Sequence, residues 1–272
     1  MAIAYQAGTA KTNTAAPGRT GNGDLTITFP AGYTPTANHF ALIILYHDQG
    51  TGSTPTNWTQ VTGSPWATGT AKLQAFWKTL AGGESDPVTT ISGSNTNISH
   101  CANMAIYSGV HATPIDTVGT ASEGTGTPMT AGSIDPTAAN AMVLGLCGRG
   151  DNEDASGQTF NASSTGVTER LDGGTNAGND SQVSMYDKTI ASGASGNGSA
   201  TTSATDPWVS VLIALAPGAT LYSAAATAIG VGLNVRSTIT SARAATAIGL
   251  GVLTKRTIIH TLPSTAIGVA LK

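Results

Sequence analysis

Short apolar runs separated by polar turns make up most of residues 1–217, and their spacing is that of β-strands. Residues 40–46 and 141–146 are almost unbroken apolar runs, which is typical of strands covered on both faces. Residues 71–80 and 100–107 alternate between two sides instead. Clusters of Gly, Pro, Ser and Asn between the runs predict turns. Strands are therefore expected at residues 25–29, 40–46, 71–80, 88–91, 100–107, 115–118, 141–146, 166–171, 182–190 and 208–216.

No stretch in this part of the chain has the apolar period of an amphipathic helix. An all-β fold follows, and many short strands joined by turn-rich loops favour an antiparallel, jelly-roll-like β-sandwich. Pro217 and Gly218 interrupt the last apolar run, so the sandwich body is predicted to span residues 1–217.

Residues 218–272 follow a different pattern, because they repeat. The motif Thr-Ala-Ile-Gly begins at Thr227, Thr246 and Thr265, so the period is 19 residues and the segment holds two and a half copies. Repeat arrays bury the apolar side of each unit on the next one and normally need three or more units. We therefore expect an extended β-repeat arm that covers its apolar side on another surface, for oligomerisation or anchoring.

Each repeat, read as an extended chain, has a bulky apolar side and a nearly bare side of Ala and Gly, which lets another backbone come close. Basic residues recur in the same segment. The predicted oligomer or anchor contacts are Ile229, Val231, Leu233, Ile248, Leu250, Val252, Ile267, Arg236, Lys255 and Arg256.

Charge divides the chain at the same place. Residues 1–218 carry 7 basic and 15 acidic residues, a net charge of −8, whereas residues 219–272 carry 5 basic residues and no acidic one. A basic, apolar segment behind an acidic body predicts docking on an acidic protein surface, including the body of a neighbouring copy. Nucleic acid is not an expected partner, because the basic residues are spread out and no aromatic residue follows Tyr222.

The overall composition is polar but weakly charged. Charged residues make up 10 % of the chain, against roughly 25 % in an average soluble domain, which is typical of surfaces exposed outside cells. We nevertheless expect no secretory signal, because the first residues lack a basic start and an apolar run, and no membrane span, because no apolar run reaches ~18 residues. A virus particle reconciles these features, because its proteins are made in the host cytoplasm and meet the exterior after lysis. Cys101 and Cys147 are expected to be buried free thiols.

Several short motifs follow one another in order along residues 40–217. They are residues 57–59 (NWT), 72–78 (KLQAFWK), 84–87 (ESDP), 106–110 (IYSGV), 114–116 (PID) and 208–217 (WVSVLIALAP). Together they resemble a β-sandwich domain common in structural proteins of tailed bacteriophages, to which short apolar repeats are often appended. The resemblance implies a virion component, on the head or on the tail, and it brings no catalytic residues with it.

Candidate catalytic and metal-binding residues are sparse. The densest acidic patch, residues 151–154, could hold Ca²⁺, but it lacks the EF-hand spacing, and a solvated loop is the favoured interpretation. His47 and Asp48 could support acid–base chemistry, whereas the serines lack the GxSxG motif of a hydrolase. We therefore expect no enzyme, no catalytic residue, no cofactor and no metal site. None of the five histidines has the spacing of a metal-binding motif; they are His39, His47, His100, His111 and His260.

Aromatic residues point to one binding function. Trp58 and Trp66 lie in a predicted loop, where their rings could stack on a sugar. Trp77 alternates within a predicted strand and is expected in the core. Glu84 and Asp86 are expected to form a turn.

The leading hypothesis is a structural virion protein of a tailed phage, displayed on the particle exterior as a homo-oligomer, with a trimer favoured. It would be a capsid decoration (cement) protein or a tail or fibre component, anchored through residues 218–272 to the major capsid protein or a tail protein. The alternative is a lectin-like receptor-binding or adhesin module that recognises host surface glycans through Trp58 and Trp66. Neither hypothesis includes a membrane span.

Overall fold

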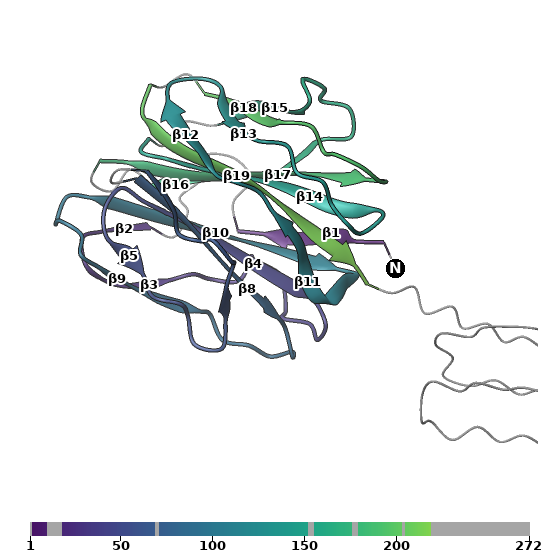
Figure 1. Cartoon of the computed structure of the whole chain (residues 1–272). Coiled ribbons are helices and arrows are strands. Elements are labelled where there is room, and N and C mark those ends of the chain that lie inside the picture. The colour runs from purple at the N-terminus through teal and green to yellow at the C-terminus, as the bar shows by residue number, and fades with distance from the viewer. Residues whose placement is uncertain are drawn as a thin grey trace, which may run out of the picture. The chain divides into compact units, whose positions relative to one another are not determined.

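The computed structural model describes residues 2–9, 18–68, 71–151, 155–175, 179–202 and 205–218 (Figure 1). These residues contain nineteen strands and no helix, and the strand pairings among them are antiparallel. The predicted all-β antiparallel sandwich is therefore confirmed. The predicted repeat arm, apart from Gly218, lies outside the described residues.

Two main sheets and two smaller outer sheets make up the body. The first main sheet contains β1 (Ala4–Gly8), β2 (Gly18–Thr20), β4 (Phe40–His47), β6 (Thr59–Gln60), β7 (Trp66–Thr68), β8 (Ala71–Thr79) and β10 (Ser99–Ser108). The second main sheet contains β11 (Val110–Val118), β12 (Ser122–Thr125), β14 (Ala141–Arg149), β16 (Thr168–Thr175), β17 (Ser181–Ile190) and β19 (Pro207–Pro217). The first outer sheet contains β3 (Gly23–Thr26), β5 (Thr51–Gly52) and β9 (Val88–Ser92), and the second contains β13 (Met129–Ala131), β15 (Ser156–Phe160) and β18 (Gly198–Thr201).

The four sheets lie in four layers. Figure 1 shows the two main sheets in the middle, with β3, β5 and β9 on one side and β13, β15 and β18 on the other. Three hydrophobic cores separate these layers: a central core between the main sheets and one core beneath each outer sheet. Each main sheet is therefore covered on both faces.

Strand β4 shows why the central strands are apolar throughout. Phe40, Leu42 and Ile44 belong to the central core, whereas Ala41 and Ile43 belong to the core beneath the first outer sheet. All eight residues of β4 and all nine of β14 are buried. Each fully buried Leu, Ile or Phe contributes roughly 1.5–3 kcal/mol, so the unbroken runs favour this double burial.

The chain builds the same arrangement of strands twice. The first main sheet has the order β1-β10-β4-β8-β6 with β2 beside β10, and the second has β11-β19-β14-β17-β16 with β12 beside β19. The outer sheets correspond in the same way, as β3-β9-β5 and β13-β18-β15. Residues 4–108 and 110–217 are thus two halves with one topology, and Gly109 joins them. Among the described strands, β7 alone has no counterpart.

The correspondence extends to individual residues. Phe40 pairs with Thr79 between β4 and β8, and Met142 pairs with Thr189 between β14 and β17. When these two pairs are superimposed, Phe40 matches Met142 and Thr79 matches Thr189, and the other residues of the central strands follow in order.

A trace of the duplication remains in the sequence. Residues 78–81 read KTLA and residues 188–191 read KTIA. Asn38 and Asn140 each precede a central strand with a positive φ, of 66° and 58°, and each donates its backbone N–H to a carbonyl of the matching segment, at 2.8 and 3.0 Å. Asn is one of the few non-glycine residues that tolerates this conformation.

Candidate functional site

The central core has two margins at which an edge of one main sheet meets an edge of the other. At one margin β1 lies against β16 and β17, and at the other β11 lies against β6 and β8. Because β1, β16 and β17 correspond to β11, β6 and β8, the two margins are counterparts. One is filled by side chains, and the other contains a hollow.

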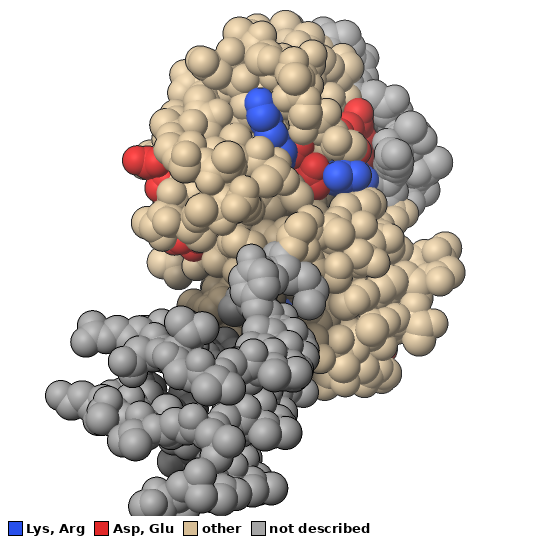
Figure 2. Space-filling model, turned by 90° about the vertical axis from the view of Figure 1, so that its right-hand side faces the viewer, with Lys and Arg blue, Asp and Glu red and all other residues tan. Residues whose placement is uncertain are grey.

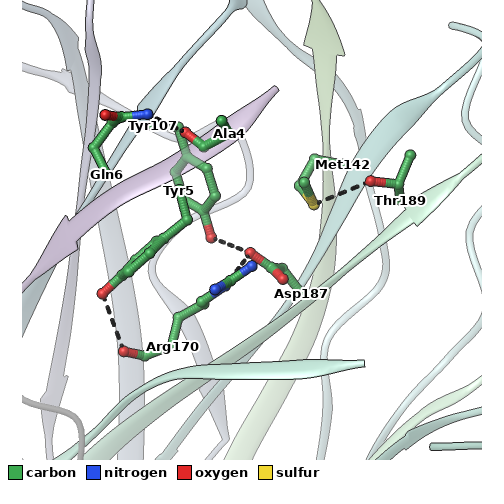
Figure 3. Close-up of polar contacts among 8 residues, drawn as sticks. All are labelled: Ala4, Tyr5, Gln6, Tyr107, Met142, Arg170, Asp187 and Thr189. Atoms are coloured by element: carbon green, nitrogen blue, oxygen red, sulfur yellow. Dashed lines mark hydrogen bonds and ion pairs between the residues drawn. The ribbon is translucent and has the colours of Figure 1, made fainter. Parts of the chain in front are cut away.

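The filled margin is a network of four side chains (Figure 3). The Tyr107 hydroxyl donates to Asp187 Oδ2 at 2.8 Å, and Arg170 Nε donates to the same oxygen at 2.7 Å. The Arg170 guanidinium carbon lies 4.6 Å from the centre of the Tyr5 ring, and the Tyr5 hydroxyl donates to the Arg170 carbonyl at 3.3 Å. The network therefore links β1 and β10 to β16 and β17.

Burial keeps the two tyrosines of this network protonated. The side chain of Asp187 is 3 % exposed and that of Arg170 is 24 % exposed. A buried carboxylate is tolerated when it is paired and hydrogen-bonded, as it is here. Burial, partly offset by Arg170, raises the pKa of Tyr5 to about 12, and burial together with Asp187 raises the pKa of Tyr107 well above its usual value. Both phenols are donors at neutral pH.

A β-bulge places Arg170 at this margin. Glu169 pairs with Tyr186 and Leu171 pairs with Met185, so Arg170 is an extra residue on β16. A bulge of this kind redirects a side chain and shifts the pairing register by one residue.

The open margin contains a hollow of about 230 Å³. Trp77 occupies the position that Asp187 holds in the second half, and Ile115 occupies the position that Tyr5 holds in the first. The hollow is lined by Thr59, Gln60, Thr62, Trp77, Ala112, Thr113, Pro114 and Ile115.

In the described residues, the segment that starts with β6 has no extra residue equivalent to Arg170. Thr59 and Gln60 pair with Trp77 and Phe76 in simple succession, and the N–H of Val61 then bonds the carbonyl of Ala75 at 2.9 Å. This segment therefore continues without the bulge that inserts Arg170 in its counterpart. As a result, the Trp77 side chain stays partly exposed and borders the hollow.

The tryptophans are placed differently from the sequence-based expectation. Trp66 is only 6 % exposed and belongs to the central core, so its ring is not a surface platform. Trp58 is half-buried against the core beneath the first outer sheet. The two are not brought together. Trp77, which was expected inside the core, packs on its margin and lines the hollow. The match between residues 78–81 and 188–191 was the sequence signal that could have aligned Trp77 with the polar Asp187.

His47 and Asp48 do not form an acid–base pair. His47 Nε2 lies 2.8 Å from Gln74 Oε1, and its ring meets that of His100 at 6.0 Å beneath the first outer sheet. Asp48 instead accepts a hydrogen bond from the Tyr46 hydroxyl. Burial lowers the pKa of His47 to about 4, so this imidazole is neutral at physiological pH.

The acidic patch contains an ion pair, and the two cysteines are buried thiols. Asp151 pairs with the buried Arg149 at 2.9 Å, while residues 152–154 lie outside the described residues. Within the described part of the chain, no group of three or more His, Cys, Asp and Glu side chains could hold a metal ion. Cys101 and Cys147 are free and buried, as expected.

The Glu84 carboxylate accepts the N–H groups of Ala81 and Gly82, so it closes the expected turn. Asp86 accepts the N–H of Phe29 at 2.8 Å. His39 contacts the Tyr33 hydroxyl at 2.9 Å, and His111 bonds the backbone of Thr113.

The predicted anchor contacts lie outside the described residues, and so does His260. They are Ile229, Val231, Leu233, Ile248, Leu250, Val252, Ile267, Arg236, Lys255 and Arg256. No helix in the described ranges has the length and apolar character to cross a membrane.

Comparison with known proteins yields no relative: no protein-family model, no curated protein and no solved structure matches the chain.

Proposed function

We propose that the chain is a structural virion protein of a tailed phage, displayed on the particle exterior and anchored through residues 218–272. The proposal is based on a contrast between two parts of the chain. The body buries its own apolar side chains, whereas the sequence of residues 218–272 places bulky apolar side chains at regular intervals. Among the large hydrophobic side chains of the described residues, Val88, at 42 % exposure, is the exposed one. The body therefore offers little apolar surface to any other segment.

The repeats carry bulky side chains at Ile229, Ile248 and Ile267 and at the positions two and four residues further along. Side chains of this size each release roughly 1.5–3 kcal/mol when they leave water. Since two and a half repeats are too few to cover themselves, a second molecule is the surface that fits. A neighbouring copy, with its acidic body, would complement the basic Arg236, Lys255 and Arg256.

The character of the body agrees with permanent exposure. Figure 2 shows a face that is largely uncharged, on which a small group of basic and acidic side chains lies together. Both faces of each main sheet are covered, so the body presents little apolar surface that would cause aggregation. We assign the protein to a homo-oligomer, a trimer in the favoured form, bound to a major capsid or tail protein as a decoration or fibre component.

The experiment is a binding assay with phage particles that lack the protein. The full chain is expected to sediment with particles, and the triple variant I229D/I248D/I267D is expected to remain in the supernatant. The variant R236Q/K255Q/R256Q should bind with an affinity that depends less on salt, because it has lost the charge attraction. V88D in the body is the matched control and should bind like the unaltered chain. Equal binding by the unaltered chain and the triple Asp variant would contradict the proposal.

A further inference from the structure

We propose that the hollow at Trp77 binds one ring of a neutral saccharide, whose apolar face lies on the indole. The proposal is independent of anchoring through residues 218–272. It transfers the glycan recognition first expected of Trp58 and Trp66 to a different site, built by β6, β8 and β11.

Comparison of the two margins shows what the hollow lacks. In the filled margin, the Arg170 guanidinium covers the Tyr5 ring at 4.6 Å and completes the polar network. In the open margin no residue of the described chain takes the place of Arg170, and Trp77 remains partly exposed. A ligand that covers an aromatic ring and supplies hydrogen-bonding groups around it would occupy the equivalent space.

The size of the hollow limits the ligand to a single ring. Its volume of about 230 Å³ is below the roughly 300–1,000 Å³ of pockets for drug-sized molecules. One six-membered ring with its substituents is a ligand of suitable size, and the rest of an oligosaccharide would extend into solvent.

The chemistry of the lining selects a neutral, hydroxyl-rich ligand. None of the eight lining residues is charged, so a charged ligand would lose hydration without gaining an ionic partner. The exposed Thr59, Thr62 and Thr113 carry hydroxyls that can both donate and accept. Trp77 and Ile115 supply the apolar part. A sugar ring combines an apolar face of C–H groups with a rim of hydroxyls, and so matches both parts.

The site is preorganised, which limits the entropy lost on binding. The Trp77 ring stacks on the buried Phe40 ring, with centroids 6.1 Å apart and planes at 25°. Strand β8 is held by β4 on one side and by β6 on the other. On the opposite wall, the N–H of Thr113 donates to His111 Nδ1 at 3.0 Å, which helps to fix the irregularly paired start of β11 that carries the threonine.

The test uses the full chain labelled with 5-fluorotryptophan. The chain contains 4 Trp residues, so ¹⁹F NMR resolves the site, and the variant W77F assigns its signal. The probes are the methyl glycosides of glucose and galactose and N-acetylglucosamine, with glucuronate as the charged comparison. We expect at least one neutral probe to shift the Trp77 signal saturably in the millimolar range, while glucuronate does not. A peptide with the sequence of residues 226–235 is included as a competing class of ligand.

Two variants test the hydrogen bonds without altering the shape of the hollow. T59V and T113V each replace a hydroxyl by a methyl group, and the double variant should bind the best saccharide about tenfold more weakly. W58F is the matched control, because Trp58 packs beneath the first outer sheet, and it should bind normally. The proposal is overturned if no neutral saccharide shifts the Trp77 signal, if the double variant binds unchanged, or if only the peptide shifts it.

Discussion

His47 illustrates, at the scale of single residues, how this fold keeps a buried polar group uncharged. The residue is fully buried on β4, with Gln74 and His100 beside it beneath the first outer sheet. Burial is the largest influence on this imidazole, and it lowers the pKa to about 4 from an ordinary value of 6.5. The hydrogen bond to Gln74 acts in the opposite direction but does not compensate.

This residue should make the body less stable in acid. Between pH 6.5 and pH 4 the unfolded chain binds a proton at His47 that the folded chain does not, so the free energy of unfolding falls as the pH falls. The loss from this group amounts to about 3 kcal/mol at and below the lower pH. Denaturant unfolding of the full chain and of H47Q across this range checks it, because H47Q should show a smaller decrease. Parallel pH profiles for the two proteins would contradict it.

The filled margin makes a second prediction about single residues. R170M leaves the Asp187 carboxylate buried without its ion pair, and should lower the free energy of unfolding by about 3 kcal/mol or more. Y107F removes one hydrogen bond to the same carboxylate and should cost about 1–2 kcal/mol. Because both changes act on one oxygen, the double variant should differ from the sum of the two single effects. Additive values in denaturant unfolding would mean that the network does not act as a unit.

At the scale of elements, apolar pattern predicted the central strands and the outer strand β9, overlapped only the end of β3, and missed the shortest outer strands. Residues 40–46 and 141–146 were expected as strands covered on both faces, and β4 and β14 are such strands. Strand β5 has only two residues and β13 only three, so neither holds enough apolar positions to show a period. The outer sheets form because the main sheets still have apolar side chains to cover, and that requirement appears only in the assembled fold.

The candidate site was beyond the same reasoning. Alternation tells which face of a strand a side chain occupies, but not how near the margin of the core it lies. It therefore assigned Trp77 to the interior. Trp66 was assigned to a loop because Gly, Ser and Pro surround it, yet it belongs to β7, pairs with Leu73 of β8 and is buried. The bulge at Arg170 has no sequence signature at all, although it distinguishes the filled margin from the open one.

The junction between β10 and β11 gives a prediction at the same scale. Gly109 has a φ of 73°, and a Cβ there would lie 2.2 Å from the Ala2 carbonyl oxygen. G109A combines backbone strain with a clash against Ala2, which precedes β1, and should lower the free energy of unfolding by about 2–3 kcal/mol. Gly83 is the matched control, since its φ is 74° and no atom lies within 4 Å of the added Cβ. G83A should cost only about 1 kcal/mol, and equal effects in thermal unfolding would contradict the packing argument.

At the scale of the whole body, the two halves are packed as the subunits of a dimer would be, but within one chain. Each half contributes one main sheet to the central core and keeps its own outer core. Leu42 and Ile44 of the first half and Leu144 and Leu146 of the second belong to the same cluster. Joining them through Gly109 turns an association between two molecules into an intramolecular one, and so removes its dependence on concentration.

This architecture predicts that neither half is stable by itself. Residues 1–109 alone would expose the central-core face of the first main sheet, and residues 110–218 alone would expose that of the second. Exposed apolar faces of this kind lead to association or aggregation. We therefore expect each half, expressed separately, to be aggregated or loosely folded, and the two co-expressed halves to form a soluble one-to-one complex. Size-exclusion chromatography with mass determination measures this directly. A soluble monomeric half that unfolds cooperatively would show that the central core is dispensable, and the body would then be two domains rather than one cooperative unit.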